Sequence, residues 1–278
     1  MKLATIRTAG GTRAVQLAEV GGAAVHLDLG YDDLGAWLAA GSPAAAPGAR
    51  TLPVDGADFA PVVPTPSKVL CVGHNYTDHI QEMGRELPSY PTLFPKFADS
   101  LIGANDDIVK PAESDALDWE VELVVVIGSA VRRATAAQAQ AAIAGFTVMN
   151  DISVRDWQFR TVEWTQGKIW DSSTPVGPYL VTPDELPGGV RPSLAVTTVV
   201  DGAVMQRDDT GTLLFDPVQL VEYISTVIRL NPGDLIATGT PAGVGHAREP
   251  AVYLAPGQRV VTTVDGVGTC TNLVVEKA

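Results

Sequence analysis

The sequence predicts an α+β fold that is mainly β, with a mixed sheet and few helices. Three observations lead to this prediction. The 278 residues are 46% hydrophobic, which is enough apolar material for one large domain, or for a large domain with a small one. β-rich runs recur through the second part of the chain, and few stretches carry helix signals. The composition argues against a disordered or fibrous chain.

The first part of the chain differs from the rest in its composition and hydrophobic pattern. Strand-like pieces lie near Lys2–Arg7 and Arg13–Leu17. Ala40–Gly48 then contains only Ala, Gly, Ser and Pro, which is typical of an exposed connection. After residue 65, apolar residues are grouped in runs typical of buried strands. We therefore predict a small N-terminal domain over residues 1–65 and a larger domain over residues 66–278.

The larger domain is predicted to alternate strands with few helices. Thr135 is placed to cap a helix over Ala136–Ala144, and Asp216 with Pro217 opens a second helix as cap and first-turn proline. Apolar residues recur at helical spacing in the second helix, and Asn231-Pro232-Gly233 ends it. The predicted strands are Lys68–Val72, Trp119–Ile127, Leu194–Val200, Asp234–Thr238, Arg259–Val264 and Thr269–Val275.

The charge balance narrows the classes of partner. There are 19 Lys and Arg against 32 Asp and Glu, so the formal net charge is 19 − 32 = −13. No cluster of basic residues is larger than Arg132-Arg133, so we expect no nucleic-acid partner. An acidic protein also repels anionic metabolites unless it neutralises them locally. Three carboxylates gathered around a divalent cation would reverse the local sign.

Cysteine usage and the amino terminus point to the compartment. Cys71 and Cys270 lie far apart in apolar stretches, and two thiols make neither a disulfide framework nor a four-thiolate zinc site. The segment Met1–Arg7 lacks the apolar run of a signal peptide, and no stretch reaches the roughly 18 apolar residues of a membrane span. We expect a soluble, cytoplasmic protein with no membrane partner.

The most informative stretch for chemistry is Asp118–Ile127. Successive side chains alternate faces along a strand, so Glu120 and Glu122 are predicted to share one face, with Trp119 on the other. Two like charges beside an apolar run call for a compensating cation. Glu-x-Glu taken alone is more often a polar stripe on a half-exposed strand, and that alternative stays open here.

A third carboxylate, Asp151, follows the apolar run Ile143–Val148. Together with the two glutamates it would complete an all-oxygen set, which suits a hard cation such as Mg²⁺, Mn²⁺ or Ca²⁺ better than zinc. On its own, Asp151 also fits an ordinary turn or cap residue.

Two further pieces are candidates for catalysis. Lys168 lies in a segment rich in aromatic and turn-forming residues, where a partly buried ammonium would face an anionic intermediate; the alternative is a surface lysine. His79 and Glu82 are three residues apart in a short predicted helix ended by Gly84, so they would share a face and suit a water-activating dyad. An exposed helix pair is the equal alternative.

A loop rich in Gly and Thr, Thr238–Gly245, follows a predicted strand directly. Backbone N–H groups and hydroxyls in such a loop can receive a carboxylate or an enolate. The loop is not a phosphate-binding P-loop, because it lacks the Gly-Lys-Ser/Thr ending.

Taken together, these pieces resemble the fumarylacetoacetate hydrolase family, from about Lys68 to Glu276. The ordered set carries the resemblance, although any one motif is weak. The motifs are Gly73-His74-Asn75-Tyr76-Thr77-Asp78-His79, Asp118-Trp119-Glu120-Val121-Glu122, Asn150-Asp151-Ile152-Ser153-Val154-Arg155-Asp156, Gly167-Lys168, Thr174-Pro175-Val176-Gly177-Pro178, Leu230-Asn231-Pro232-Gly233-Asp234 and Thr238–Gly245.

The resemblance implies a mixed β-sandwich roll with a small N-terminal α/β domain, assembled as a homodimer. It implies Mg²⁺ or Mn²⁺ held by Glu120, Glu122 and Asp151, with Lys168 beside the ion. It also implies a lid that carries His79 and Glu82 over a small anionic keto-acid substrate. Phe94–Ser100 keeps a lysine but lacks the Lys-Pro-Pro of many members, so the distal pocket is expected to differ. The substrate contacts expected on this basis are Tyr76, Arg85, Lys96, Gln158, Gly239 and Thr240.

The activity implied by the resemblance is hydrolysis of an acylpyruvate or a related diketo acid, such as fumarylpyruvate, to pyruvate and a carboxylic acid. An oxaloacetate-type decarboxylase and a 2-hydroxyhepta-2,4-diene-1,7-dioate isomerase are alternatives, because both use the same metal-enolate chemistry. A non-catalytic metal-binding or carboxylate-binding protein on the same scaffold is a third reading.

Overall fold

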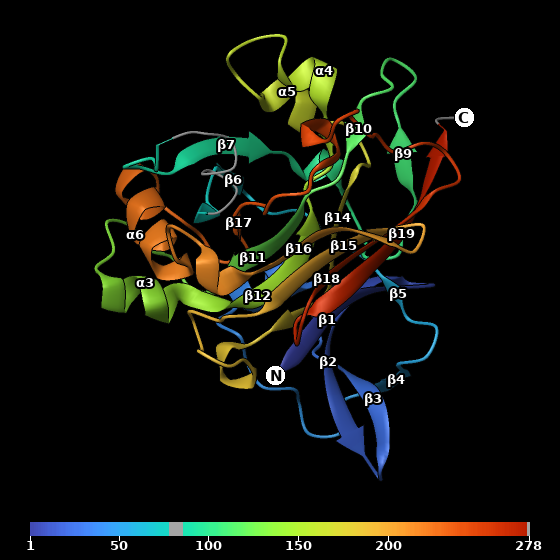
Figure 1. Cartoon of the computed structure of the whole chain (residues 1–278). Coiled ribbons are helices and arrows are strands. Elements are labelled where there is room, and N and C mark those ends of the chain that lie inside the picture. Colours follow the sequence, from blue (N-terminus) through green and yellow to red (C-terminus); the bar gives the residue numbers. More distant parts are fainter. Residues whose placement is uncertain (78–85, 277–278) are drawn as a thin grey trace.

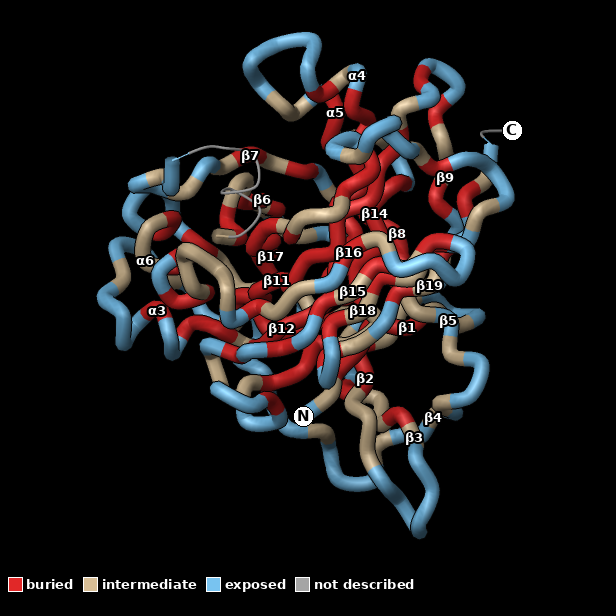
Figure 2. Tube along the Cα trace, viewed as in Figure 1, coloured by how far each residue is buried: buried red, intermediate tan, exposed pale blue. Residues whose placement is uncertain are grey.

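The computed structural model describes residues 1–77 and 86–276, and a large mixed sheet runs through this part of the chain. Buried strands occupy the middle of the molecule (Figures 1 and 2). In spatial order the sheet contains β4 (Thr51–Pro53), β3 (Ala23–Asp28), β2 (Gly11–Val20), β1 (Lys2–Thr8), β14 (Thr174–Val181), β12 (Ile143–Asn150), β11 (Val121–Ile127), β17 (Leu235–Ala237), β6 (Val69–Gly73) and β7 (Thr92–Lys96).

The N-terminal strands extend this sheet rather than lying apart from it. β1 pairs antiparallel with β14, with Leu3 opposite Leu180. The short strand β5 (Asp58–Phe59) pairs with β1, and β8 (Leu101–Ile102) pairs with β14. The predicted boundary at residue 65 stays a prediction, and backbone pairing joins its two sides.

A second sheet packs across the first. Its spatial order is β16 (Ala203–Asp209), β15 (Ala195–Val200), β18 (Arg259–Val264), β19 (Gly268–Glu276) and β9 (Ile108–Lys110). β15 contacts β11, β18 contacts both β11 and β12, and the four strands lie over one another in Figure 1. Two further short strands, β10 (Leu117–Asp118) and β13 (Ser153–Val154), pair with each other. The prediction of a mainly β, mixed-sheet sandwich is therefore confirmed.

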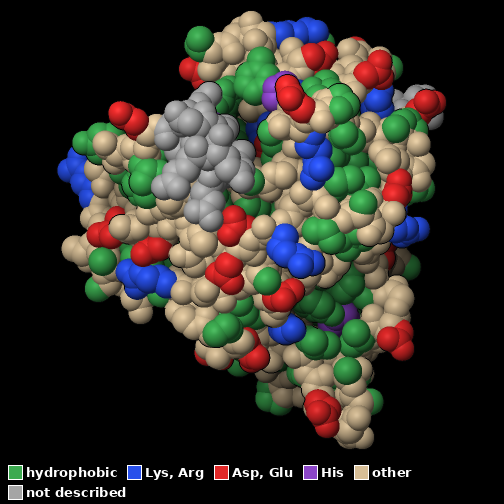
Figure 3. Space-filling view, viewed as in Figure 1, with side chains coloured by type: hydrophobic (Ala, Val, Ile, Leu, Met, Phe, Trp, Pro, Cys, Tyr) green, Lys and Arg blue, Asp and Glu red, His purple; other side chains and the backbone are tan. Residues whose placement is uncertain are grey.

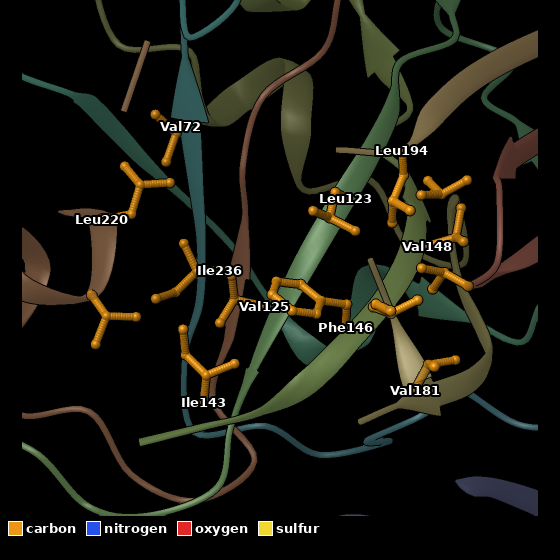
Figure 4. Close-up of a cluster of buried hydrophobic side chains, with 14 of the residues drawn as sticks. Val72, Leu123, Val125, Ile143, Phe146, Val148, Val181, Leu194, Leu220 and Ile236 are labelled. Atoms are coloured by element: carbon orange, nitrogen blue, oxygen red, sulfur yellow. The ribbon is translucent and has the colours of Figure 1, made fainter. Parts of the chain in front are cut away.

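The main core lies on one face of β11 and β12. Leu123, Val125, Phe146 and Val148 are fully buried there, together with Val181 of β14 (Figure 4). Alternate residues of β11, such as Val124, pack into a second apolar cluster on the opposite face. Because apolar side chains cover both faces, β11 is an interior strand, and charges at its start are placed in a dry environment.

The two predicted helices are confirmed at their starts. Asp216 caps α6 (Pro217–Val227), and Thr135 caps α3 (Ala136–Ala142); each start is a capping box. α3 ends two residues earlier than predicted, because Ile143 already belongs to β12. The other helices of the described residues are short: α1 (Leu34–Ala39), α4 (Arg155–Gln158), α5 (Thr165–Lys168), and the 3₁₀ turns Ala98–Ser100, Pro183–Glu185, Thr210–Thr212 and Gly245–Ala247. Within the described ranges no helix is long and apolar enough to cross a membrane.

Candidate active site

Three carboxylates meet where β11 begins and β12 ends. The two strands pair with Val121 opposite Asn150, and the backbone N–H of Asp151 donates to the carbonyl of Glu120 at 2.8 Å. This register brings Glu120, Glu122 and Asp151 together, with one oxygen from each lying within 4.8 Å of the others. All three residues are buried, so Glu120 and Glu122 are not the exposed polar stripe of the alternative interpretation.

Cations surround two of these carboxylates. Nζ of Lys168 lies 2.7 Å from Oε2 of Glu120 and 2.8 Å from Oδ2 of Asp151. Nζ of Lys96 lies 2.7 Å from Oδ1 of Asp151, and Nη2 of Arg155 lies 2.7 Å from Oε1 of Glu120. We expected Lys96 near a distal substrate group, whereas the structure pairs it with a carboxylate of the proposed metal set.

The electrostatics distinguish the three acids. Burial by itself raises the pKa of Asp151, but ion pairs with Lys168 and Lys96 outweigh burial and lower that pKa to about 2. Burial raises the pKa of Glu122 well above its ordinary value, and repulsion from Asp151 and Glu120 raises it further. Glu122 is thus the member of the set that most lacks positive charge.

The donor set fits a hard divalent cation. All candidate ligands are carboxylate oxygens, the ligand type that Mg²⁺ and Mn²⁺ prefer. Among the residues described, Glu122 has no ion-pair partner, and its Oε2 accepts a hydrogen bond from the backbone N–H of Gly239 at 2.7 Å. An added cation would supply the charge that Glu122 lacks.

The loop Thr238–Gly245 lies beside the carboxylates. Gly239 has a φ of +102°, and a Cβ there would lie 3.0 Å from both Cβ of Asn75 and the carbonyl of Val72. Glycine therefore lets the loop turn tightly enough to aim its N–H at Glu122. Further along, the N–H of Gly245 donates to Oδ1 of Asp118 at 2.7 Å. The loop is thus attached at both ends to the segment that carries the glutamates.

A pocket of about 550 Å³ opens onto the site. Five of the predicted site residues line this pocket. They are the proposed metal ligands Glu120 and Glu122, together with Lys168, Gln158 and Thr240. Gln158 accepts a hydrogen bond from Nη1 of Arg155 at 2.8 Å. A larger cavity of about 760 Å³, beside Trp157 and Trp170, contains none of the three carboxylates.

The described structure does not place four other predicted site residues in this pocket. Tyr76 is fully buried, and its hydroxyl has no hydrogen-bond partner among the described residues. His79, Glu82 and Arg85 lie outside the described residues.

Two residues of the site were missed as individual candidates. Arg155 joins Glu120, Asp118 and Gln158 from a buried position, and in the sequence it stands out only as part of the longer motif Asn150–Asp156. His246 lines the pocket, and its Nδ1 lies 2.9 Å from the Tyr253 hydroxyl. Its signal in the sequence is its position directly after the Gly/Thr-rich loop.

Comparison with known proteins identifies the relatives of this site. Residues 68–275 match the family described as fumarylacetoacetate (FAA) hydrolase, C-terminal. The chain belongs to the fumarylacetoacetate hydrolase family. The predicted resemblance is therefore confirmed over three quarters of the chain, and the carboxylates, Lys168 and the Thr238–Gly245 loop all lie inside the matched region.

Two mammalian proteins that are similar to this chain are named as oxaloacetate tautomerases. The mitochondrial oxaloacetate tautomerase FAHD2A of Bos taurus is 42% identical over 226 residues, covering 81% of this chain and 71% of the relative. The human FAHD2A tautomerase is 41% identical with the same coverage. Hydrolysis of an acylpyruvate in particular stays a prediction.

Solved structures of the family cover the whole chain. The fumarylacetoacetate hydrolase of Exiguobacterium antarcticum is 32% identical with a TM-score of 0.88, and each chain covers 100% of the other. The 5-carboxymethyl-2-hydroxymuconate delta-isomerase of Mycobacterium smegmatis is 34% identical with a TM-score of 0.82, again over 100% of both chains. Proteins named as a hydrolase and an isomerase thus share this architecture.

Proposed function

We propose that this chain is a divalent-metal-dependent enzyme that interconverts the keto and enol forms of a small 2-oxo dicarboxylate of the oxaloacetate type. The bridging ammonium of Lys168, within 2.8 Å of both Glu120 and Asp151, carries the proposal. Fixed positive charge beside an all-carboxylate set suits a reaction in which negative charge grows on a substrate oxygen. The names of the mammalian relatives support this choice of reaction.

Each group in the described part of the site has a role in this proposal. Glu120, Glu122 and Asp151 would hold Mg²⁺ or Mn²⁺, which supplies Lewis-acid character when bound. Lys168 adds a permanent positive charge: burial lowers its pKa, but Asp151 and Glu120 outweigh burial and raise it above the ordinary value. The loop Thr238–Gly245 would receive a substrate carboxylate through its backbone N–H groups.

A keto–enol exchange also needs a base that removes a proton from carbon and returns it. We propose His79 and Glu82 for this step, with Arg85, Gln158, Gly239 and Thr240 as substrate contacts. Tyr76 and Lys96 are left out of this set because both are buried and neither lines the pocket. We further propose a homodimer in the cytoplasm.

Hydrolysis of an acylpyruvate such as fumarylpyruvate is the second candidate function. The similarity to the fumarylacetoacetate hydrolase of Exiguobacterium antarcticum favours it. The pocket of about 550 Å³ also lies within the size range of small-molecule sites, so a substituent larger than that of oxaloacetate is compatible with it. In this case His79 and Glu82 would activate a water molecule instead of moving a carbon-bound proton.

The test measures three reactions on one preparation. Protein loaded with Mn²⁺ is mixed with enol-oxaloacetate, and loss of the enol absorbance is followed against a blank that contains the metal alone. Pyruvate release from oxaloacetate and from fumarylpyruvate is measured in parallel. Faster enol loss without pyruvate supports the tautomerase, whereas pyruvate from fumarylpyruvate supports the hydrolase.

Variants tie the activity to the site. Glu122→Gln removes a proposed ligand, and Glu113→Gln, on an exposed loop, is its control. We expect Glu122→Gln to abolish the activity and Glu113→Gln to leave it unchanged. A wild-type rate in Glu122→Gln would refute the metal-dependent proposal.

A further inference from the structure

Glu120 directly precedes β11 and Glu122 lies within it, and the backbone between these two glutamates needs partners that no described strand supplies. β17 pairs with β11 from Leu235 to Ala237, opposite Val126 to Val124, and therefore ends before it reaches Val121. Val121 is fully buried, so its N–H and carbonyl would be unsatisfied without other groups. Side chains fill this position in place of a strand.

Gln206 supplies one of these partners. It reaches the site from β16 in the second sheet and is 1% exposed. Its Oε1 accepts from the backbone N–H of Val121 at 3.1 Å and from the hydroxyl of Thr198 at 2.8 Å. Its Nε2 donates to Oγ1 of Thr240 at 2.8 Å and to the carbonyl of Pro241 at 3.0 Å.

The orientation of this amide has a single solution. A backbone N–H only donates and a proline carbonyl only accepts, so Oε1 must face Val121 and Nε2 must face Pro241. All four contacts are then satisfied at a buried site. A fully satisfied buried network of this kind restricts its members to one arrangement.

Thr240 completes a closed circuit. Its hydroxyl accepts from Gln206 and donates to the carbonyl of Val121 at 3.0 Å. Val121, Gln206 and Thr240 thus bond one another in turn. The circuit joins the strand that carries Glu120 and Glu122 to the loop that lines the pocket with Thr240.

We propose that Gln206 is a positioning residue, which holds the Thr238–Gly245 loop at a fixed distance from the glutamates of β11. It does not line the pocket, so it acts through Thr240 and Val121. The inference rests on the proposed function in one respect, namely that this loop receives a substrate carboxylate. Groups that orient ligating or binding residues from behind commonly change affinity by about 10- to 100-fold when removed.

The experiment compares three variants of the full chain. Gln206→Met removes all four hydrogen bonds at nearly constant volume. Gln206→Glu keeps the side-chain length and both acceptor contacts, but it replaces the donating Nε2 by an oxygen, so it removes the amide's two donations to the loop by a different chemical change, the burial of an acid. Thr198→Val is the matched control, because Thr198 is equally buried and its side-chain hydroxyl bonds the same amide rather than the loop or the backbone of β11.

The first readout is binding of oxalate, an unreactive 2-oxo-acid mimic, to protein loaded with Mn²⁺. We expect Gln206→Met and Gln206→Glu to weaken oxalate binding at least about 10-fold, while Thr198→Val stays within about two-fold of wild type. The second readout is the urea midpoint, which should fall in Thr198→Val as well as in Gln206→Met. Unchanged oxalate affinity in both Gln206 variants, or an equal loss in Thr198→Val, would overturn the inference.

Kinetics separate this inference from the proposed function. With oxaloacetate, the Gln206 variants should raise KM more than they lower kcat. If wild-type protein binds Mn²⁺ and oxalate but turns over no keto acid, the proposed function fails. The oxalate affinities of the variants then still decide whether Gln206 positions the loop.

Discussion

Nζ of Lys96 lies 2.7 Å from Oδ1 of Asp151, and neither side chain is exposed to solvent. Lys168 contacts the other oxygen of the same carboxylate. With Arg155 on Glu120, every oxygen of Asp151 and Glu120 faces a cation, whereas in the described part of the chain Glu122 has only the backbone N–H of Gly239 as a partner. The positive charge in the site is therefore distributed unevenly over the three carboxylates.

Removing Lys96 should destabilise the metal-free protein. For Lys96→Met we expect the free energy of unfolding to fall by about 3 kcal/mol, the lower end of the range for a broken buried pair, because Lys168 still faces Asp151. Urea unfolding measures this loss. Mn²⁺ should restore part of it, because an ion that binds only the folded state stabilises that state.

Lys110→Met is the control for Lys96→Met. Lys110 pairs with Asp115, whose side chain is fully exposed, so the loss of Lys110 should lower the free energy of unfolding far less than the loss of Lys96. Equal losses in the two variants would show that burial of the Lys96–Asp151 pair contributes nothing.

Lys168 should speed the reaction by stabilising negative charge on the substrate, and should not itself act as the acid or base that moves the proton. Lys168→Met is expected to lower kcat by about 10²- to 10³-fold, the usual effect of losing one group that stabilises developing negative charge. Because ion pairs raise its pKa above 10.5, Lys168 stays charged from pH 6 to 9. A basic limb in the pH–rate profile of wild type that disappeared in Lys168→Arg would contradict this assignment.

Binding of a divalent metal should release protons. Burial and the neighbouring carboxylates raise the pKa of Glu122, so in the metal-free protein this carboxyl group keeps its proton to a higher pH than an exposed glutamate does. A carboxylate must lose its proton to ligate a metal, so affinity for Mn²⁺ should rise with pH. Calorimetric titration in two buffers of different ionisation enthalpy counts the protons. Glu122→Gln should release fewer of them; an unchanged count would show that Glu122 is not their source.

Acidification should weaken the N-terminal strands through His26. This buried ring contacts the Tyr179 hydroxyl and the Pro53 carbonyl. Burial lowers its pKa below 6.5, although the bond to Pro53 opposes the shift. As the pH falls, His26 is therefore protonated in the unfolded chain at a higher pH than in the folded protein. Stability from this group is complete above pH 6.5 and is lost as the pH falls through the lower folded-state value.

His26→Gln isolates that contribution. Glutamine can contact both partners but does not titrate, so the difference in unfolding free energy between wild type and variant should shrink as the pH falls below 6.5. Urea unfolding from pH 7.5 to 5 measures it. A difference that is constant with pH would refute the role of His26.

Local patterns were enough to predict part of the fold and site. Alternation along one strand predicted that Glu120 and Glu122 would share a face, and both side chains take part in the carboxylate cluster. Cap residues predicted the starts of α3 and α6, since capping depends on a few neighbouring residues. The strand itself begins at Val121 rather than Trp119.

Other features depend on contacts between distant segments. Lys96 lies 55 residues before Asp151, and its ion pair arises only because β7 and β12 belong to one sheet. In the same way, nothing near Gln206 in the sequence indicates that it meets Val121 across the sandwich. Pairing of β1 with β14 likewise joins residues on the two sides of the domain boundary predicted at residue 65.

Two segments on the walls of the pocket, the Thr238–Gly245 loop and the segment between α4 and α5, differ in how much substitution they can tolerate. Gln206 and Asp118 bind the loop wall tightly, whereas Phe159, Thr161 and Val162 line the pocket from the exposed segment between α4 and α5 (Figure 1). On the face in Figure 3, basic and acidic side chains are interspersed, so no continuous basic area constrains that surface. Val162 is 93% exposed, and replacing it should cost little stability. The segment between α4 and α5 is therefore the place to redesign substrate preference, and sequence divergence there offers a route to new substrates with the same metal chemistry.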